Sequence, residues 1–236
     1  MPTICDVIVI GVGGMGSAAC FELARRGLRV VGLEQFPLVH SRGSSHGRTR
    51  IIRTAYYEHP DYVPLLRRAW DRWYELEQLT GRHLLTECPC LMVGPEAGEV
   101  VVGVRAAARA HGLAVESLTA AEVGRRAPFR FPDDYAGVLE HAAGFLAVED
   151  CVRAHADAAA AHGADIRTEE AVRSWAARGT GVEVVTDRDT YHAARLVVTA
   201  GAWATRLLAG LGVPLTVMRQ VLTWFRTDPA LVRRDR

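Results

Sequence analysis

The chain has 236 residues, which is enough to bury a substantial core in one large or two small domains. Its formal net charge of +1 gives no general attraction to nucleic acid or to acidic membranes, and no apolar run approaches membrane-spanning length. The five cysteines form no C-x-x-C pair, and no secretory signal opens the sequence, so we expect reduced thiols and a globular protein of the cytoplasm.

The first predicted elements are a strand and a helix joined by a glycine turn. An apolar, β-branched run predicts a buried strand over 6–10, and a helix is expected over 15–26. Between and at the start of these elements, Gly11, Gly13 and Gly16 have the G-x-G-x-x-G spacing. In a dinucleotide site such glycines allow a tight turn, close approach of the backbone to a pyrophosphate, and close packing of helix on sheet.

A second apolar strand, predicted over 28–33, ends at Glu34. An acid at the end of this strand can accept hydrogen bonds from a ribose hydroxyl. Because the glycine motif lies between a strand and a helix and is followed by this acid, we interpret it as a dinucleotide-binding motif. The alternative is an ordinary turn.

The rest of the chain changes character twice. A long loop over 36–49 precedes an amphipathic helix over 61–80. An α+β stretch then follows, with strands predicted at 90–93, 113–118, 137–140 and 145–148, and helices at 99–111, from the Thr119–Glu122 capping box, and at 149–162. The last part predicts short strands at 165–168, 171–175, 182–186 and 190–192, a buried strand at 195–199, a helix at 204–210 and a strand at 220–226.

This order predicts an α/β fold with two interleaved domains. A parallel strand–helix–strand unit is interrupted by the α+β stretch, and the chain then returns to a buried strand with a glycine turn. The parallel sheet would therefore be built from both ends of the chain.

Two arginines follow the loop. Arg50 and Arg53, at i and i+3, could face one pocket if this stretch is a helical turn, and a guanidinium there would pair bidentately with a carboxylate. The alternative is a pair of solvated surface arginines. The histidines, His141 among them, and the neighbouring Glu140 show no ligand spacing, so we expect no metal.

Several segments carry a resemblance to a known family: the opening glycine motif, Gly43-Ser-Ser-His-Gly-Arg-Thr-Arg-Ile-Ile-Arg53, Leu196-Val-Val-Thr-Ala-Gly-Ala-Trp203 and Met218-Arg-Gln220. Together they resemble the monomeric sarcosine oxidase and N-methyltryptophan oxidase group of glycine/D-amino-acid-oxidase-like flavoproteins. The resemblance runs nearly the full length of the chain. It implies a Rossmann-like FAD-binding parallel sheet domain over 1–84 and 146–216, interleaved with an incomplete α+β substrate domain over 85–145 and 217–236.

The resemblance also assigns residues. FAD rather than NAD would be held by Gly11, Gly13, Gly14 and Gly16 at the pyrophosphate, Glu34 at the adenosine ribose, Ser44, Ser45, Thr49 and Arg50 in the loop lining the flavin, Val172 beside the adenine, and Gly201 and Trp203 in a second motif closing over the cofactor. Arg53 would hold the carboxylate of an amino-acid substrate, and Arg50 would stabilise the reduced flavin. His46 either supports the loop or lies beside the flavin.

The implied reaction is oxidation of the C–N bond of an N-methyl or secondary amino acid, with oxygen as acceptor. Members of the group extend beyond the position of Arg236, with a flavin-linked cysteine and a lysine implicated in the reaction with oxygen. This sequence contains no lysine, and none of its cysteines matches the linked one. A Rossmann sheet without the C-terminal strand and helix of the group is expected to leave an open edge and an exposed apolar face.

Two other functions remain open at this point. One is a catalytically silent FAD-binding fragment, or half of a split flavoprotein whose partner chain supplies the C-terminal part. The other is an NAD-dependent dehydrogenase, which the 43–53 segment argues against.

Overall fold

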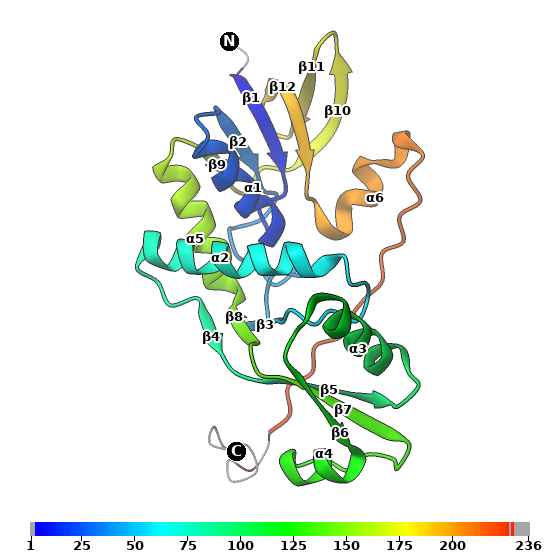
Figure 1. The fold of residues 1–236 in the computed structure, drawn as a ribbon. Coiled ribbons are helices and arrows are strands. Elements are labelled where there is room, and N and C mark those ends of the chain that lie inside the picture. The colour runs from blue at the N-terminus through cyan, green and yellow to red at the C-terminus, as the bar shows by residue number, and fades with distance from the viewer. Residues whose placement is uncertain (1–2, 227, 229–236) are drawn as a thin grey trace. The chain divides into compact units, whose positions relative to one another are not determined.

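The computed structural model describes residues 3–226 and 228 and contains two compact units (Figure 1). The first unit comprises Met1–Thr49, Thr80–Leu84 and Ala147–Val221, and the second comprises Arg50–Leu79, Leu85–Leu146 and Leu222–Arg236. These units place residues 50–79 with the second part of the chain, whereas the sequence assigned them to the first. The predicted domain roles stay predictions, and residues 227 and 229–236 of the predicted substrate domain lie outside the described residues.

The first unit is built on a six-stranded sheet with the order β10-β11-β12-β1-β2-β9. Strands β12, β1, β2 and β9 are parallel, whereas β10, β11 and β12 pair antiparallel. The bounds are β1 (Thr3–Ile10), β2 (Val30–Leu33), β9 (Asp165–Arg167), β10 (Val172–Arg178), β11 (Gly181–Thr186) and β12 (Thr190–Val198). The predicted parallel sheet from both ends of the chain is therefore confirmed.

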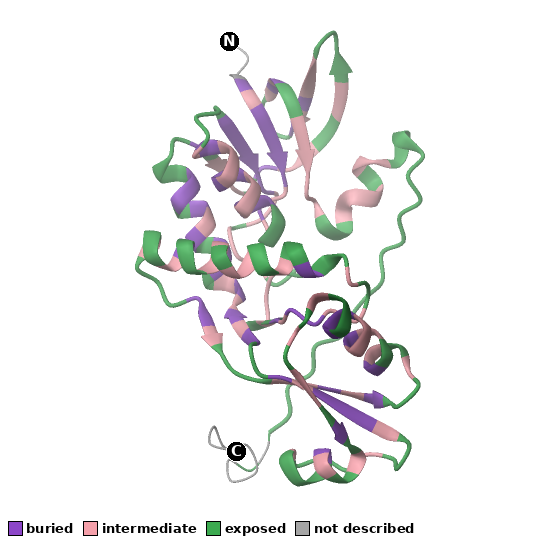
Figure 2. Ribbon diagram, in the orientation of Figure 1, coloured by how far each residue is buried: buried purple, intermediate pink, exposed green. Residues whose placement is uncertain are grey.

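Apolar residues explain why β1 lies at the centre of this sheet. Ile8 pairs with Val31 on one side and with Leu196 on the other, and its side chain is fully buried. Figure 2 shows β1 and β2 buried along most of their length. Strand β12 is continuous where two separate strands were predicted, because its middle residue Ala193 pairs with Cys5 of β1 on one side and with Val182 of β11 on the other.

Two helices of the first unit pack against each other, α1 (Gly14–Ala24) and α5 (Val148–Ala161). The ring of Phe21 lies 6.0 Å from that of His155 and 5.6 Å from that of His162, measured between centroids. Burial lowers the pKa of His155, which favours the neutral imidazole against this aromatic ring.

The second unit contains two three-stranded sheets, β3-β8-β4 and β5-β7-β6. Helix α3 packs its Val101 and Val104 onto Met92 and Val138 of the β5-β7-β6 sheet. The capping box of Thr119 and Glu122 is formed as predicted. The bounds are β3 (Thr49–Ile52), α2 (Tyr62–Thr80), β4 (Leu85–Glu87), β5 (Cys90–Pro95), α3 (Glu99–His111), β6 (Val115–Thr119), α4 (Ala120–Arg126), β7 (Tyr135–Glu140) and β8 (Gly144–Ala147).

The last described part of the chain differs most from the prediction. The helix predicted over 204–210 is shorter: it is α6 (Ala204–Leu207), preceded by the 3-10 turn η1 (Gly201–Trp203) and followed by η2 (Ala209–Leu211). The strand predicted over 220–226 is wrong, because these residues form no helix or strand. An extended segment becomes a strand only when a neighbouring strand accepts and donates its backbone hydrogen bonds.

Within the described part of the chain, no helix combines the length and the apolar character needed to cross a membrane. The same residues include no group of three or more His, Cys, Asp or Glu side chains placed to hold a metal ion.

Candidate functional site

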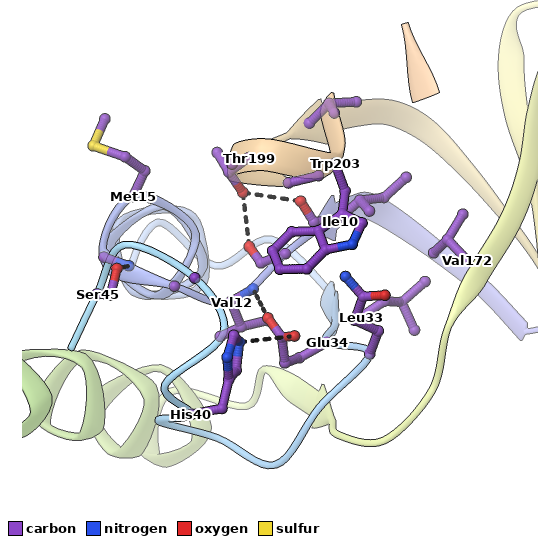
Figure 3. A pocket seen from close by; sticks show the side chains of 18 of the residues that line it. Ile10, Val12, Met15, Leu33, Glu34, His40, Ser45, Val172, Thr199 and Trp203 are labelled. Carbon is purple, nitrogen blue, oxygen red and sulfur yellow. Dashed lines mark hydrogen bonds and ion pairs between the residues drawn. The ribbon is translucent and has the colours of Figure 1, made fainter. Parts of the chain in front are cut away.

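A pocket of about 400 Å³ lies in the first unit, where β1, β2 and β12 end (Figure 3). Its wall comprises the turn after β1, the start of α1, the loop after Glu34, the start of β10 and the segment that follows β12. Ligands of open parallel sheets bind at the carboxyl ends of the strands, and this pocket occupies that position.

The turn after β1 is packed directly against the end of β12. Gly11 has φ +88°, and a Cβ there would lie 2.6 Å from the carbonyl oxygen of Thr199. The hydroxyl of Thr199 lies 2.7 Å from the carbonyl oxygen of Gly11 and 3.1 Å from that of Ile10, and it donates to this turn. Gly16 is equally constrained, since a Cβ there would lie 1.7 Å from the carbonyl oxygen of Gly11. The turn therefore needs glycine for space as well as for conformation.

The N-terminal end of α1 faces the pocket, and its first turn carries no acidic side chain. The N-cap residue is Gly13, which has no side chain to cap the helix. The backbone N–H of Gly14 donates to Ser45 Oγ at 2.8 Å. A helix start of this kind attracts an anion through its N–H groups and its dipole.

The Glu34 side chain is held at the end of β2 by three contacts. Its Oε2 accepts from the backbone N–H of Val12 at 2.9 Å, and its Oε1 accepts from that of Phe36 at 3.1 Å. His40 Nε2 lies 3.5 Å from Oε1 (Figure 3). These contacts fix the carboxylate in the pocket wall. The residue is only 6% exposed.

Aromatic side chains border the same pocket. Figure 3 shows the indole of Trp203 within it. The Phe36 ring lies 5.4 Å from that of Trp203 and 4.7 Å from that of His40, and the Arg42 guanidinium lies 4.7 Å from the Phe36 centroid. Of these rings, the indole of Trp203 lines the pocket and provides an apolar face on which a planar ligand group can stack.

The loop that carries Ser45 is anchored by Glu149 at the start of α5. Glu149 Oε1 accepts from the backbone N–H of Gly47 at 2.8 Å and of Arg48 at 3.2 Å, both of which have positive φ. Burial alone would raise the pKa of Glu149, but these backbone hydrogen bonds and the charge of His46 lower the pKa below its ordinary value. This anchor could not be predicted from local sequence patterns, because its hydrogen bonds join residues about a hundred positions apart.

The pocket brings together most of the predicted cofactor residues: Gly11, Gly13, Gly14, Glu34, Ser44, Ser45, Val172, Gly201 and Trp203. Gly16 packs against the carbonyl oxygen of Gly11 in the turn, His46 belongs to the loop, and Thr49 begins β3; the lining of the pocket includes none of the three. Sequence reasoning missed Thr199, Glu170 and His40, which also line it. Thr199 had a usable signal, because it ends a buried strand at the edge where ligands bind.

Arg50 and Arg53 belong to the second unit, and the helical turn considered for them is wrong. Arg50 lies in the strand β3, and Arg53 directly follows it. Residues at i and i+3 of an extended strand project to opposite faces, so the strand itself does not direct both guanidinium groups to one side.

Arg53 has an unusual environment. Its guanidinium carbon lies 4.6 Å from the Tyr56 ring centroid and 5.4 Å from that of Tyr57, and its Nη2 lies 3.5 Å from Glu58 Oε1. Its Nε is buried without a hydrogen-bond partner among the described residues. A buried, donor-only group with a free N–H is suited to bind an anionic ligand.

A parallel sheet with a glycine turn, an open helix start and an acid ending the next strand defines a Rossmann-like nucleotide-binding fold. The chain belongs to the FAD-dependent oxidoreductase family, whose sequence profile matches residues 6–235.

Individual relatives agree with this assignment. The chain is 46% identical to the monomeric sarcosine oxidase of Streptomyces avermitilis over 94% of its own length and 58% of that protein. It is 37% identical to the monomeric sarcosine oxidase of a Bacillus species over its full length and 61% of that protein. The N-methyl-L-tryptophan oxidase of Yersinia pestis is 37% identical, with 94% of this chain and 60% of that protein covered. The chain therefore spans about three fifths of the length of these curated relatives.

Solved structures show the same fold. NikD, an unusual amino acid oxidase essential for nikkomycin biosynthesis, matches with a TM-score of 0.78 and 32% identity, over 89% of this chain and 55% of that one. Glycine oxidase from Geobacillus kaustophilus matches with a TM-score of 0.74 and 27% identity, over 90% of this chain and 60% of that one. The predicted class of fold and the resemblance are thereby confirmed.

The cofactor of the family is FAD, and the pocket residues fit its ADP half. A Cβ at Gly13 or Gly14 would meet only the side chain of Ser45, at 3.3 and 3.2 Å, so the backbone beside the helix start is open to a phosphate. Glu34 presents a fixed acceptor one strand away. A volume of about 400 Å³ lies within the range of ordinary ligand pockets.

Proposed function

We propose that this pocket binds the ADP half of FAD. The observation that carries the proposal is the helix start at Gly13 and Gly14 and the buried acceptor Glu34 on the wall of one pocket. In this arrangement the pyrophosphate contacts the N–H groups of α1 beside Ser45, and the ribose hydroxyls donate to Glu34. Val172 borders the adenine, and Gly201 and Trp203 cover the cofactor, while Gly11 and Gly16 keep the turn tight.

We assign the flavin side of the cofactor to Ser44 and His46 in the loop after β2 and to Thr49 and Arg50 at the start of β3. Arg53 would bind the carboxylate of an amino-acid substrate. The support for this role is its buried Nε without a partner and the two tyrosine rings that hold its guanidinium.

The reaction that we propose is oxidation of the C–N bond of an N-methyl or secondary amino acid, with oxygen as the electron acceptor. Bound FAD would supply the redox chemistry by accepting a hydride equivalent from the carbon next to nitrogen. The names of the relatives support this substrate class: two are monomeric sarcosine oxidases and one is an N-methyl-L-tryptophan oxidase. We further propose a reducing compartment such as the cytoplasm, which agrees with all five cysteines being free.

The test begins with the cofactor. Purified protein is titrated with FAD, and bound flavin is measured by absorbance and after denaturation. We expect saturable binding that Glu34→Ala abolishes or weakens strongly, whereas Glu169→Ala, a change at an exposed acid, leaves it intact. Binding that Glu34→Ala does not change would contradict the proposed site.

The activity is tested separately. Flavin-loaded protein is mixed anaerobically with sarcosine or N-methyl-L-tryptophan, and loss of the flavin absorbance band is followed, after which oxygen is admitted and peroxide is measured. Bleaching by neither amino acid would reject the proposed substrate class, and bleaching without peroxide would reject oxygen as acceptor.

A second candidate is a catalytically silent FAD-binding fragment or half of a split flavoprotein. It is favoured by exposed apolar side chains at Val221, Trp224 and Phe225. In this case FAD binds but does not bleach. Adding a separately produced C-terminal segment of the Streptomyces avermitilis enzyme, as a substitute for a partner chain, would then restore bleaching.

A further inference from the structure

Glu170 is a buried acid in the pocket wall for which neither the glycine motif nor the proposed chemistry has a use. It is only 3% exposed, yet it lines the pocket together with Val172. Its backbone N–H donates to the carbonyl oxygen of Glu34 at 2.9 Å. If Glu34 holds the ribose, as the proposed function has it, the adjoining segment 170–172 borders the base.

The side chain of Glu170 is fixed by two hydroxyl groups. Its Oε1 accepts from the hydroxyl of Tyr191 at 2.6 Å and from that of Thr186 at 2.7 Å. No donor from the described residues contacts its Oε2. One carboxylate oxygen is therefore satisfied by the protein, and the other is available to a ligand in the pocket.

The direction of the hydrogen bonds is set by an arginine. Arg167 Nη1 donates to the Tyr191 hydroxyl, and Arg167 Nε lies 2.8 Å from Asp165 Oδ2. Because a guanidinium only donates, the tyrosine accepts from it and passes its own proton toward Glu170. Burial raises the pKa of Tyr191 to about 12, and the hydrogen bond to Glu170 acts in the same direction, so the phenol keeps this proton. Glu170 therefore enters the network as an acceptor.

We infer that Glu170 makes the pocket selective for a nucleotide whose base carries an exocyclic amino group, that is, for a 6-aminopurine over a 6-oxopurine. A fixed acceptor gains a hydrogen bond from an amino group, whereas it is left facing the carbonyl oxygen of a 6-oxopurine. Sites built to bind one N–H group reject ligands that lack it, because the buried polar group of the protein then has no partner. This inference rests on the proposed function, since it requires a nucleotide in the pocket.

The experiment compares two nucleotides that differ at position 6 of the base and in the hydrogen on N1 that accompanies the 6-oxo group. Dissociation constants of ADP and of inosine diphosphate are measured calorimetrically for the wild-type protein, for Glu170→Gln and for Glu169→Gln. Glu169 is the matched control, because it is the adjacent acid in the sequence and is exposed. The ratio of the two dissociation constants is the decisive readout, because loss of a purely structural contact would weaken the binding of both nucleotides by the same factor.

We expect the wild-type protein to bind ADP at least about tenfold more tightly than inosine diphosphate. The amide of Glu170→Gln can donate to the 6-oxo group, so its ratio should fall to roughly two or less, while Glu169→Gln keeps the wild-type ratio. A wild-type ratio near one, or an unchanged ratio in Glu170→Gln, would overturn the inference while leaving the proposed pocket intact. Failure of the wild-type protein to bind ADP would overturn both.

Discussion

Gly16 illustrates how single atoms decide the shape of the pocket. A Cβ at this position would lie 1.7 Å from the carbonyl oxygen of Gly11 and 2.6 Å from Thr199 Oγ1. Both neighbours are fixed, since Thr199 is itself bonded to the turn. The helix start, the glycine turn and β12 would all have to shift to admit one methyl group.

Gly16→Ala should therefore destabilise the protein by roughly 3 kcal/mol or more and abolish nucleotide binding. Urea unfolding followed by circular dichroism measures the change in free energy. Gly210→Ala is the control, because a Cβ there meets nothing within 4 Å, and it should stay within about 0.5 kcal/mol of the wild-type value. Equal effects of the two changes would show that packing at the turn is not the cause.

Arg53 provides a prediction at the substrate. In protein that turns over an N-methyl amino acid, Arg53→Ala should raise KM by a factor equivalent to roughly 2–3 kcal/mol, because a charge-assisted pair with the carboxylate is lost. Steady-state kinetics measure it. Arg130→Ala changes an exposed arginine and serves as control. An unchanged KM in Arg53→Ala would exclude the proposed role.

The site residues that could be predicted from the sequence are those whose spacing along the chain is itself characteristic of a nucleotide site. The glycines and Glu34 could be found because a turn, a helix start and a strand end each leave a short-range pattern. Glu170 and Glu149 could not be found, because their roles depend on partners such as Tyr191 and Gly47 that lie elsewhere in the chain. Periodicity and spacing contain no information on which distant donor reaches an acid.

At the scale of elements, the loop between β2 and β3 depends on one helix start. Glu149 joins this loop to α5, and the backbone N–H of Val148 donates to the carbonyl oxygen of Arg48 at 3.1 Å. Val39 and Arg48 both have positive φ, which is unfavourable for residues with a side chain and especially for a β-branched one. The loop therefore keeps its conformation only while such anchors hold it.

Glu149→Gln should lower the free energy of unfolding by about 1 kcal/mol at neutral pH, because the charged acceptor is lost. The folded-state pKa of Glu149 is below its ordinary value of 4.5, so the carboxylate contributes stability above that value. This contribution disappears as the pH falls through the folded-state pKa. The difference between wild type and variant, measured by urea unfolding from pH 7 to pH 3, should shrink toward the acid end.

Asp150→Asn is the control for this series. Asp150 is exposed on the same helix start, and its ion pair among the described residues is with Arg153, at 3.2 Å. Surface pairs of this kind contribute little, so we expect a much smaller difference from wild type. A difference for Glu149→Gln that persists undiminished at pH 3 would reject the carboxylate as the anchor.

Most elements were predicted, and the failures share a cause. Strands and helices with their own periodicity, such as β1, α1 and α3, lie where the sequence placed them. The arginine-bearing segment was considered as a helical turn but is the strand β3, because pairing within the β3-β8-β4 sheet decides its backbone. The segment over 220–226 is rich in β-branched and aromatic residues, but it pairs with no strand of the described residues. The residue pattern sets how readily a segment forms a strand, and pairing with a neighbouring strand decides whether the strand forms.

For the molecule as a whole, the exposed apolar side chains after residue 212 are the main liability. Val221 is 78% exposed and Phe225 is 81% exposed. Contiguous apolar groups on extended backbone promote association with other chains.

The double variant Trp224→Ser/Phe225→Ser should reduce self-association of the purified protein several-fold, as measured by light scattering against concentration. Phe129→Ser removes an exposed phenylalanine of the second unit and is the control, for which little change is expected. If the control reduces scattering as much as the double variant, general surface hydrophobicity rather than this segment causes association.

The central strand also has a consequence for biosynthesis. β1 leaves the ribosome well before β12, yet Thr3 pairs with Tyr191 of β12. At roughly 5–20 residues per second, translation takes on the order of 10–40 s to deliver that partner. During this interval β1 has the edge that later pairs with β12 uncovered, so nascent chains are expected to need a chaperone at this stage.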